Sequence, residues 1–234
     1  MSALHVENNT PFFDIDGTLL LTGGAVRIAF ERIFMELFGV SGAWRGLVPD
    51  GKTDPLIIHE LIESNLQRAV TPKDFDEIRR RYLIYFEEEL GRVEKFCVMP
   101  GVAALMPDLA AQAHLSLGVA TGNFERPAWL KLERAGLQTF FCFGGFGEES
   151  HGRPGLVSEA LRRGREFVGG NVLPENVFVV GDTIHDIEAG WMLGLRTIGV
   201  ATGTTPLETL KEAKADAVLP DLTDKQAFFD ILNR

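Results

Sequence analysis

The part of the sequence after about residue 115 alternates short apolar segments with segments of helical periodicity. Strands are expected at 115–120, 140–146, 176–180, 196–200 and 217–219. Helices are expected between and after them, at 125–135, 156–167, 186–193, 207–213 and 225–232. Strands that alternate with helices of this length form right-handed βαβ units, and these build a parallel sheet covered on both faces. The sequence therefore predicts an α/β fold with a doubly wound, Rossmann-like parallel sheet.

The N-terminal part of the sequence has a different pattern. A short strand is expected to end near Asp14, although the residues leading into it are polar and include Pro11, which cannot donate to a strand ladder. Apolar residues then recur at helical spacing within 24–38, 53–66 and 71–90, with no convincing strand among them. We therefore predict a core domain made of residues 1–21 and 96–234, with an α-helical cap domain, residues 22–95, inserted after the first strand.

The overall composition narrows the classes of partner. The 234 residues are 45% hydrophobic and 24% charged, which is ordinary for a soluble globular protein. The net charge of −10 opposes a general attraction to nucleic acid or to anionic lipid. There is neither a signal-peptide pattern nor an apolar run of about 20 residues that would span a membrane. Two isolated cysteines fit a reducing compartment, so we expect a cytoplasmic protein; the sequence does not indicate its oligomeric state.

Polar residues follow three of the expected strands. They are Asp14 and Asp16, Thr121 and Asn123, and Asp182 and Asp186. The carboxyl ends of parallel strands lie at one edge of a sheet, where such folds bind their ligands. Buried carboxylates are costly unless they bind a cation, and oxygen ligands of this kind suit Mg²⁺. The pattern predicts a Mg²⁺ site involving Asp14, Asp182 and Asp186. The alternatives are an ordinary turn at Asp16-Gly17 and, for Asp186, a charge that stabilises a helix N-terminus.

Three motifs carry a family resemblance. The segments FFDIDGTLL (12–20), VATGN (119–123) and VVGDTIHD (179–186) resemble the haloacid dehalogenase (HAD) superfamily in order and spacing. The likeness runs from about residue 12 to residue 220. The helical stretch after the first motif looks like the small α-helical cap of phosphoglycolate-phosphatase-like members. The resemblance implies a hydrolase with a Rossmann-like core, a magnesium cofactor and a small phosphorylated metabolite as its partner.

The resemblance also implies roles for the two aspartates of the first motif. Asp14 is expected to be the nucleophile that forms an aspartyl-phosphate. Asp16 is expected to protonate the leaving oxygen and then to deprotonate the hydrolytic water. Their two-residue offset allows Asp14 to face the metal while Asp16 faces the leaving group.

Further roles follow for the other two motifs. Thr121 is expected to bind the phosphoryl group, with help from the main-chain N–H groups of Gly122 or Asn123. Mg²⁺ would be held by Asp14, the main-chain carbonyl of Asp16, and Asp182. Asp186 would support the metal directly or through water.

One position departs from the family pattern. The superfamily usually has a lysine, often followed by proline, between the second and last motifs, to clamp phosphate and steady the nucleophile. Here the corresponding stretch is EESHGRPG (148–155). Counting without a gap places His151 at the lysine position, whereas Arg153-Pro154 mimics the chemistry of the lysine. Arginine is permanently charged and binds phosphate through two donors, so we predict that Arg153 is the substitute rather than a surface arginine.

The segment GLVPDGKT (46–53) matches the P-loop pattern. A true P-loop follows a buried strand that aims it at the phosphates, and 41–45 has little strand character. A nucleotide P-loop is therefore not expected. The segment falls in the cap, where loops of related enzymes contact the leaving group. Lys52 is thus a candidate for substrate binding, although a solvated loop lysine fits equally well.

These observations predict a Mg²⁺-dependent phosphatase that hydrolyses a small phosphate monoester. Asp16 argues against two relatives, because haloacid dehalogenases and phosphonate hydrolases lack this second aspartate. A phosphosugar mutase of the β-phosphoglucomutase type retains it and is an alternative. A binding or regulatory protein with a degenerate HAD site is a second alternative, supported by the missing lysine and the short first strand.

Overall fold

The computed structural model describes residues 9–149, 152–170 and 172–234. Within these ranges six parallel strands form one sheet, in the order β5-β4-β1-β6-β7-β8. Their bounds are Thr10–Phe13 (β1), Gly118–Ala120 (β4), Phe143–Gly145 (β5), Val177–Gly181 (β6), Arg196–Val200 (β7) and Ala217–Leu219 (β8). The predicted α/β fold is confirmed, although β4 and β5 are shorter than the apolar segments that indicated them.

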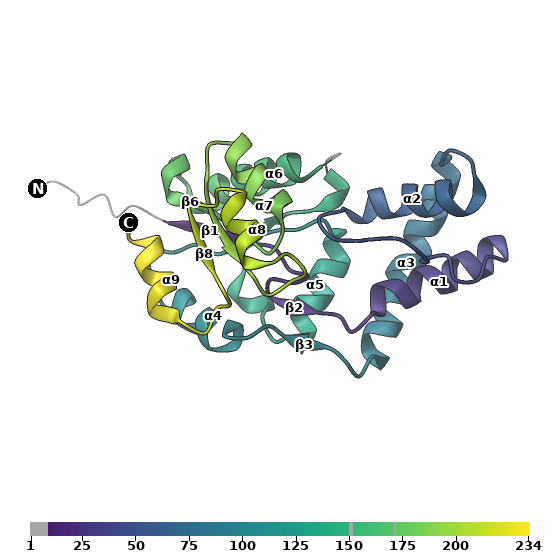
Figure 1. Ribbon diagram of the computed structural model, residues 1–234, viewed down its shortest axis with the longest axis horizontal. Helices are drawn as coiled ribbons and strands as arrows, with labels where there is room; N and C mark the ends of the chain where they lie inside the picture. The colour runs from purple at the N-terminus through teal and green to yellow at the C-terminus, as the bar shows by residue number, and fades with distance from the viewer. Residues whose placement is uncertain (1–8, 150–151, 171) are drawn as a thin grey trace, which may run out of the picture.

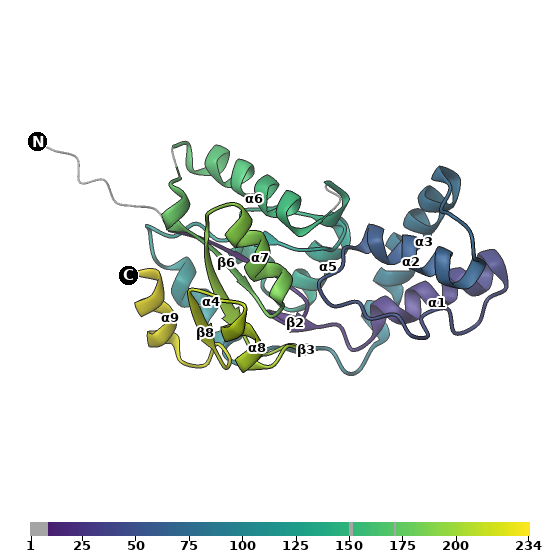
Figure 2. The same cartoon turned by 45° about the horizontal axis from the view of Figure 1, so that its top comes forward.

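Helices cover both faces of this sheet (Figure 2). They are α4 (Val102–Ala110), α5 (Glu125–Arg134), α6 (Arg153–Val168), α7 (Ile184–Met192), α8 (Leu207–Glu212) and α9 (Lys225–Leu232), with 3₁₀ turns at Gln138–Phe140, Gly147–Glu149 and Pro174–Asn176. Neighbouring residues of a strand point to opposite faces, and β1 shows this clearly. Phe13 packs against Phe141 and Phe228 on the side of α4, α5 and α9, whereas Phe12 packs against Phe143 on the side of α6 and α7.

The structure accounts for Pro11 in the central strand. Asp14 donates its main-chain N–H to Val180 of β6 at 2.9 Å, so the main-chain N–H groups of alternate residues of β1 point to β6. The nitrogen of Pro11 therefore points the other way, toward β4. Pairing between β1 and β4 begins only at Phe12, which lies beside Gly118. On this side Pro11 lies in a gap between an isolated bridge, Asn9 with Leu115, and the ladder that begins at Phe12. Its missing donor therefore falls where the pairing is interrupted, and the short polar approach is compatible with a central strand.

Helices α1 (Ala25–Phe38), α2 (Asp54–Leu66) and α3 (Pro72–Arg92) lie together at one end of the molecule (Figure 1). They share an apolar cluster in which Phe30 stacks on Tyr82, with ring centroids 4.5 Å apart. The cluster extends into the core through two residues of the α5 region: Phe124, which precedes the helix, and Leu130, which lies within it. The packing agrees with the expected helical cap, and its boundary at residues 22–95 stays a prediction.

A small antiparallel pair, β2 (Leu20–Leu21) and β3 (Cys97–Val98), joins the chain where it enters and leaves the three helices. Neither strand was expected, because two residues are too few to show a period. Cys97 and Cys142 are both exposed and free, and no disulfide joins them. Among the described residues, no helix has the length and apolar content needed to cross a membrane.

Candidate active site

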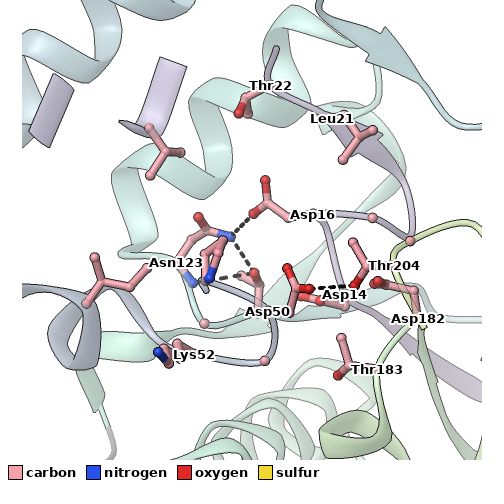
Figure 3. Close-up of a pocket in the computed structure, with 18 of the residues that line it drawn as sticks. Asp14, Asp16, Leu21, Thr22, Asp50, Lys52, Asn123, Asp182, Thr183 and Thr204 are labelled. Carbon is pink, nitrogen blue, oxygen red and sulfur yellow. Dashed lines mark hydrogen bonds between the residues drawn. The ribbon is translucent and has the colours of Figure 1, made fainter. Parts of the chain in front are cut away.

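The ends of three neighbouring strands meet at one cavity, as expected for a parallel sheet. Asp14, Thr121 and Asp182 directly follow β1, β4 and β6. The cavity has a volume of about 550 Å³ and lies between the core and helices α1 and α2. Its lining includes Asp14, Asp16, Thr121, Lys131, Arg153 and Asp182 from the core, and Lys52 and Asp54 from the cap (Figure 3). The predicted site residues that the structure describes are therefore gathered at one place.

Three buried carboxylates form an acidic cluster on the β1–β6 side of the cavity. Asp14, Asp182 and Asp186 each offer an oxygen within 4.8 Å of the others. Burial, together with the charges of Asp14 and Asp186, raises the pKa of Asp182 to about 8. Burial also raises the pKa of Asp186. These shifts express the cost of placing like charges together away from water, and a bound cation would remove that cost.

Arg153, the first residue of α6, lies against this cluster. Its Nη1 donates to Asp14 Oδ1 at 3.2 Å and its Nη2 to Asp14 Oδ2 at 2.8 Å, which is a two-pronged ion pair. Nη2 also lies 3.1 Å from Asp186 Oδ1. The side chain is only 7% exposed, so the surface-arginine interpretation is wrong. His151, the competing candidate, lies outside the described residues.

The chemistry of the cluster fits a divalent metal ion. Three carboxylates and one guanidinium leave two negative charges, which a dication would balance. Two glycines also make room for the carboxylate of Asp182: a Cβ on Gly17 or on Gly203 would lie 2.4 or 1.7 Å from its Oδ2. Oxygen-only ligands of this kind suit Mg²⁺ better than a softer metal.

Asp186 belongs to the acidic cluster and also caps the N-terminus of α7. Its Oδ2 accepts from the main-chain N–H and the hydroxyl of Thr183, at 3.1 and 2.7 Å. This is a capping box at the start of α7, so the helix-capping interpretation of Asp186 also holds. The other oxygen faces Arg153, and direct metal binding by Asp186 stays a prediction.

A second cluster surrounds Asp16 on the side of α5. Asp16 Oδ2 accepts from Lys131 Nζ at 2.6 Å and from Asn123 Nδ2 at 2.7 Å (Figure 3 shows Asp16 and Asn123). Asn123 Nδ2 also donates to Thr121 Oγ1 at 2.6 Å, and Asn123 Oδ1 accepts from Lys131. Because the Thr121 oxygen accepts here, its own hydrogen remains available for another acceptor. The Asn123 side chain is committed to these neighbours, and its main-chain N–H also donates to Thr121 Oγ1, at 3.4 Å. Phosphate binding by Asn123 stays a prediction.

Lys131 was missed by the sequence analysis, which treated 125–135 only as a helix. Its side chain is 1% exposed. A signal was present in the spacing: Lys131 lies four residues after Pro127 and three after Ala128, and all three are buried on one stripe of α5. A lysine on such a stripe needs a buried partner.

The start of α2 and the loop before it rest directly on the core. Asp54 donates its main-chain N–H to Gly122 O at 2.8 Å, and its Oδ2 accepts from Phe124 N at 2.7 Å. Burial raises the pKa of Asp54 to about 7. A Cβ on Gly122 would lie 2.4 Å from Lys52 O, so this contact requires glycine. The sequence analysis had placed Asp54 only at the start of a helix and did not foresee the contact.

Lys52 lines the cavity and forms an ion pair with Glu60 of α2. In Figure 3 it lies on the side of Asn123 away from Asp182. Its predicted contact with the substrate stays a prediction. Turns, and no strand, lead into segment 46–53 in the described chain, so the P-loop interpretation is excluded as expected.

The fold and the site define an α/β enzyme whose carboxylates meet in a cavity beneath a helical cap. The sequence model of the haloacid dehalogenase-like hydrolases matches residues 12–200, and the chain belongs to this family. It is therefore a hydrolase, which argues against the alternative of a binding protein with a degenerate site.

Similarity to individual proteins extends over most of the chain. The sequence is 23% identical over 219 residues to the pyrophosphatase PpaX of Oceanobacillus iheyensis, covering 92% of this chain and 94% of that protein. The structure of a Haemophilus somnus protein described as a predicted phosphoglycolate phosphatase matches with a TM-score of 0.72 at 17% identity, covering 97% and 100% of the two chains. CbbY of Rhodobacter sphaeroides, solved in complex with phosphate, matches with a TM-score of 0.69 at 24% identity, covering 92% and 95%.

Proposed function

We propose that the protein is a Mg²⁺-dependent phosphatase that hydrolyses a small phosphate monoester through an aspartyl-phosphate. One observation carries this proposal: Asp14 is fixed by the fork of Arg153 beside Asp182 and Asp186, and Asp16 faces the same cavity. The arrangement supports a nucleophile, a cation site and a proton donor within reach of one phosphoryl group.

The residues of the chain supply two half-reactions. In the first, a carboxylate oxygen of Asp14 attacks phosphorus, the bond from phosphorus to the leaving oxygen breaks, and Asp16 gives that oxygen a proton. In the second, Asp16 removes a proton from water, the water oxygen attacks phosphorus, and Asp14 leaves as a carboxylate with release of inorganic phosphate. Bound Mg²⁺ would neutralise charge between the Asp14 carboxylate and the phosphoryl oxygens.

Binding of the phosphoryl group is assigned to residues at the end of β4 and to Arg153. In its contact with Asn123 the Thr121 hydroxyl is the acceptor, so its hydrogen is not used there. This supports a hydrogen bond from Thr121 to a phosphoryl oxygen. The main-chain N–H groups of Gly122 or Asn123 would add a second contact. Arg153 would oppose the charge of the phosphoryl group while it keeps Asp14 in one orientation.

The substrate is a small phosphorylated metabolite. A cavity of about 550 Å³ beneath the cap favours a compact substrate, and the relative PpaX is named a pyrophosphatase, so inorganic pyrophosphate belongs among the compounds to test. Lys52 is proposed to face the leaving group from the cap. The exposed free thiols of Cys97 and Cys142 fit the proposed cytoplasmic location.

Hydrolysis of 4-nitrophenyl phosphate, with and without Mg²⁺, tests the proposal. We expect turnover that needs the metal and that falls at least about 1,000-fold in Asp14→Asn, because the variant lacks the nucleophile. Turnover that is independent of the metal and unchanged in Asp14→Asn would contradict the mechanism. Supplying β-glucose 1-phosphate and separating inorganic phosphate from an isomerised sugar phosphate distinguishes a phosphatase from a mutase.

A further inference from the structure

The ammonium group of Lys131 is buried where the core helix α5 meets the cap. Its side chain is 1% exposed, and its Nζ lies 5.6 Å from the centre of the Phe86 ring on α3. Removing a charged group from water is unfavourable unless the group is paired and hydrogen-bonded. The neighbours Leu130 and Leu132 are also buried, so an apolar side chain would suit this position if packing alone mattered.

The partners of Lys131 are the proposed acid/base residue and the amide that touches it. Nζ donates to Asp16 Oδ2 at 2.6 Å and to Asn123 Oδ1. Asn123 in turn donates to the same oxygen of Asp16 at 2.7 Å. Lys131, Asn123 and Asp16 therefore form a closed triangle of hydrogen bonds, with both donors directed at Oδ2.

This triangle distinguishes the two carboxylate oxygens of Asp16. Oδ2 is held from the side of α5 by two donors, and no described residue donates to Oδ1. The Asp16 side chain is 39% exposed and lines the cavity. A carboxylate held by one oxygen can present only the other oxygen to a substrate in the cavity.

We propose that Lys131 is a positioning residue for proton transfer: by holding Oδ2 of Asp16, it presents Oδ1 to the leaving oxygen of the substrate. The inference rests on the proposed phosphatase function. Proton transfer depends on distance and alignment, so a loosened Asp16 hinders the reaction most when the leaving group needs its proton. A purely structural ion pair would instead affect all substrates alike.

Two aryl phosphates of similar shape test this role. Phenolate, whose conjugate acid has a pKa of about 10, leaves poorly without a proton, whereas 4-nitrophenolate is a far weaker base and leaves readily. In Lys131→Met we expect kcat/KM to fall at least about 10-fold more for phenyl phosphate than for 4-nitrophenyl phosphate. Lys131→Gln retains a donor without the charge and should show a smaller difference.

A double-mutant cycle shows whether Lys131 acts through Asp16. Asp16→Asn should itself show the strong leaving-group dependence, and Lys131→Met added to it should not change the ratio between the two substrates further. Lys225→Met is the matched control, because Lys225 pairs with Asp108 at 2.6 Å, as Lys131 does with Asp16, but does not line the cavity. It should leave that ratio unchanged. Circular dichroism with thermal melting verifies that each variant is folded.

The outcomes separate this inference from the proposed function. If the wild-type protein hydrolyses both esters with Mg²⁺ but folded Lys131→Met and Lys131→Gln lose activity equally on both, the positioning role is overturned and the phosphatase stands. An additive effect of Lys131→Met in the Asp16→Asn background also overturns it. No turnover by the wild-type protein overturns the proposed function, and the positioning role with it.

Discussion

Two buried cations flank the Asp14-Ile15-Asp16 segment, and their surroundings differ in charge. We call Arg153 with Asp14, Asp182 and Asp186 the Arg153 cluster, and Lys131 with Asp16 and Asn123 the Lys131 cluster. The Arg153 cluster contains three carboxylates and one cation, whereas the Lys131 cluster contains one carboxylate and one cation. When all carboxylates are ionised, the Arg153 cluster therefore keeps two uncompensated negative charges, whereas the Lys131 cluster is balanced.

This difference divides the tasks of the two aspartates. The pKa of Asp182 rises to about 8 in the Arg153 cluster, because burial and two neighbouring carboxylates disfavour its charge. On the proposed function, a metal ion would complete this cluster. The Lys131 cluster needs no metal ion to balance its charge, because Lys131 and Asn123 both donate hydrogen bonds to Asp16 Oδ2. Dependence on metal should thus originate in the Arg153 cluster.

The largest expected effect is from Arg153→Met. The substitution removes the fork that holds Asp14 and leaves the three carboxylates without their cation, so kcat/KM should fall by about 100- to 1,000-fold. Arg153→Lys is the matched variant: it keeps the charge but not the two-pronged geometry, and should recover part of the loss. Steady-state kinetics on 4-nitrophenyl phosphate measures both. Full activity in Arg153→Met would show that the fork is dispensable.

A smaller effect is expected on the free energy of unfolding when Mg²⁺ binds to the folded protein without substrate. At 100 times its dissociation constant, Mg²⁺ should stabilise the fold by about 2.7 kcal/mol. The pKa of Asp182, about 8, lies above its ordinary value of 3.8, so protonation stabilises the metal-free fold at low pH, and this contribution is lost as the pH rises through about 8. Protons compete with the metal, and the gain from Mg²⁺ should be larger at pH 8.5 than at pH 6.

Thermal melting at both pH values, with and without Mg²⁺, provides the measurement. Asp182→Asn is the control: it should lose the response to Mg²⁺ and, at pH 8.5 without metal, should melt no lower than the wild-type protein, because one of the repelling charges is gone. An equal response to Mg²⁺ in Asp182→Asn would place the metal away from the Arg153 cluster.

The smallest expected effect concerns Asp54, the cap residue that contacts the start of α5. Burial raises the pKa of Asp54 from 3.8 to about 7. The protonated carboxyl therefore stabilises the folded state, fully so below about pH 4, and this contribution is lost as the pH rises from about 4 through 7. Asp54→Asn retains an acceptor for Phe124 N and removes the titration. Between pH 5 and pH 8 the variant should lose about 2.5 kcal/mol less stability than the wild-type protein.

Urea unfolding of the metal-free proteins at the two pH values tests this expectation. Asp50→Asn is a suitable control, since Asp50 also joins the cap to the core, through the hydroxyl of Thr204 at 2.5 Å, but from an exposed position. It should change the pH dependence little. Identical pH dependence in Asp54→Asn and the wild-type protein would show that Asp54 does not titrate in this range.

Much of the fold and part of the site could be predicted. Asp14, Thr121 and Asp182 could be brought together from the sequence because the carboxyl ends of parallel strands share an edge. Arg153 could be placed beside them only through the family pattern and the chemistry of its side chain. The β2–β3 pair could not be predicted, since two-residue strands carry no periodic signal.

The sequence by itself determined the class of fold and the residues at the strand ends, because alternation of strands and helices is a local property with a small set of solutions. Only the tertiary structure decided that Lys131 and Asp54 belong to the site. Both lie in helices, where a charged residue ordinarily faces water. Their burial depends on how α5 docks beneath Asp16 and how the cap rests on the core. Long-range packing of this kind leaves little local pattern: the buried stripe of α5 marks the position of Lys131 but does not identify its partner.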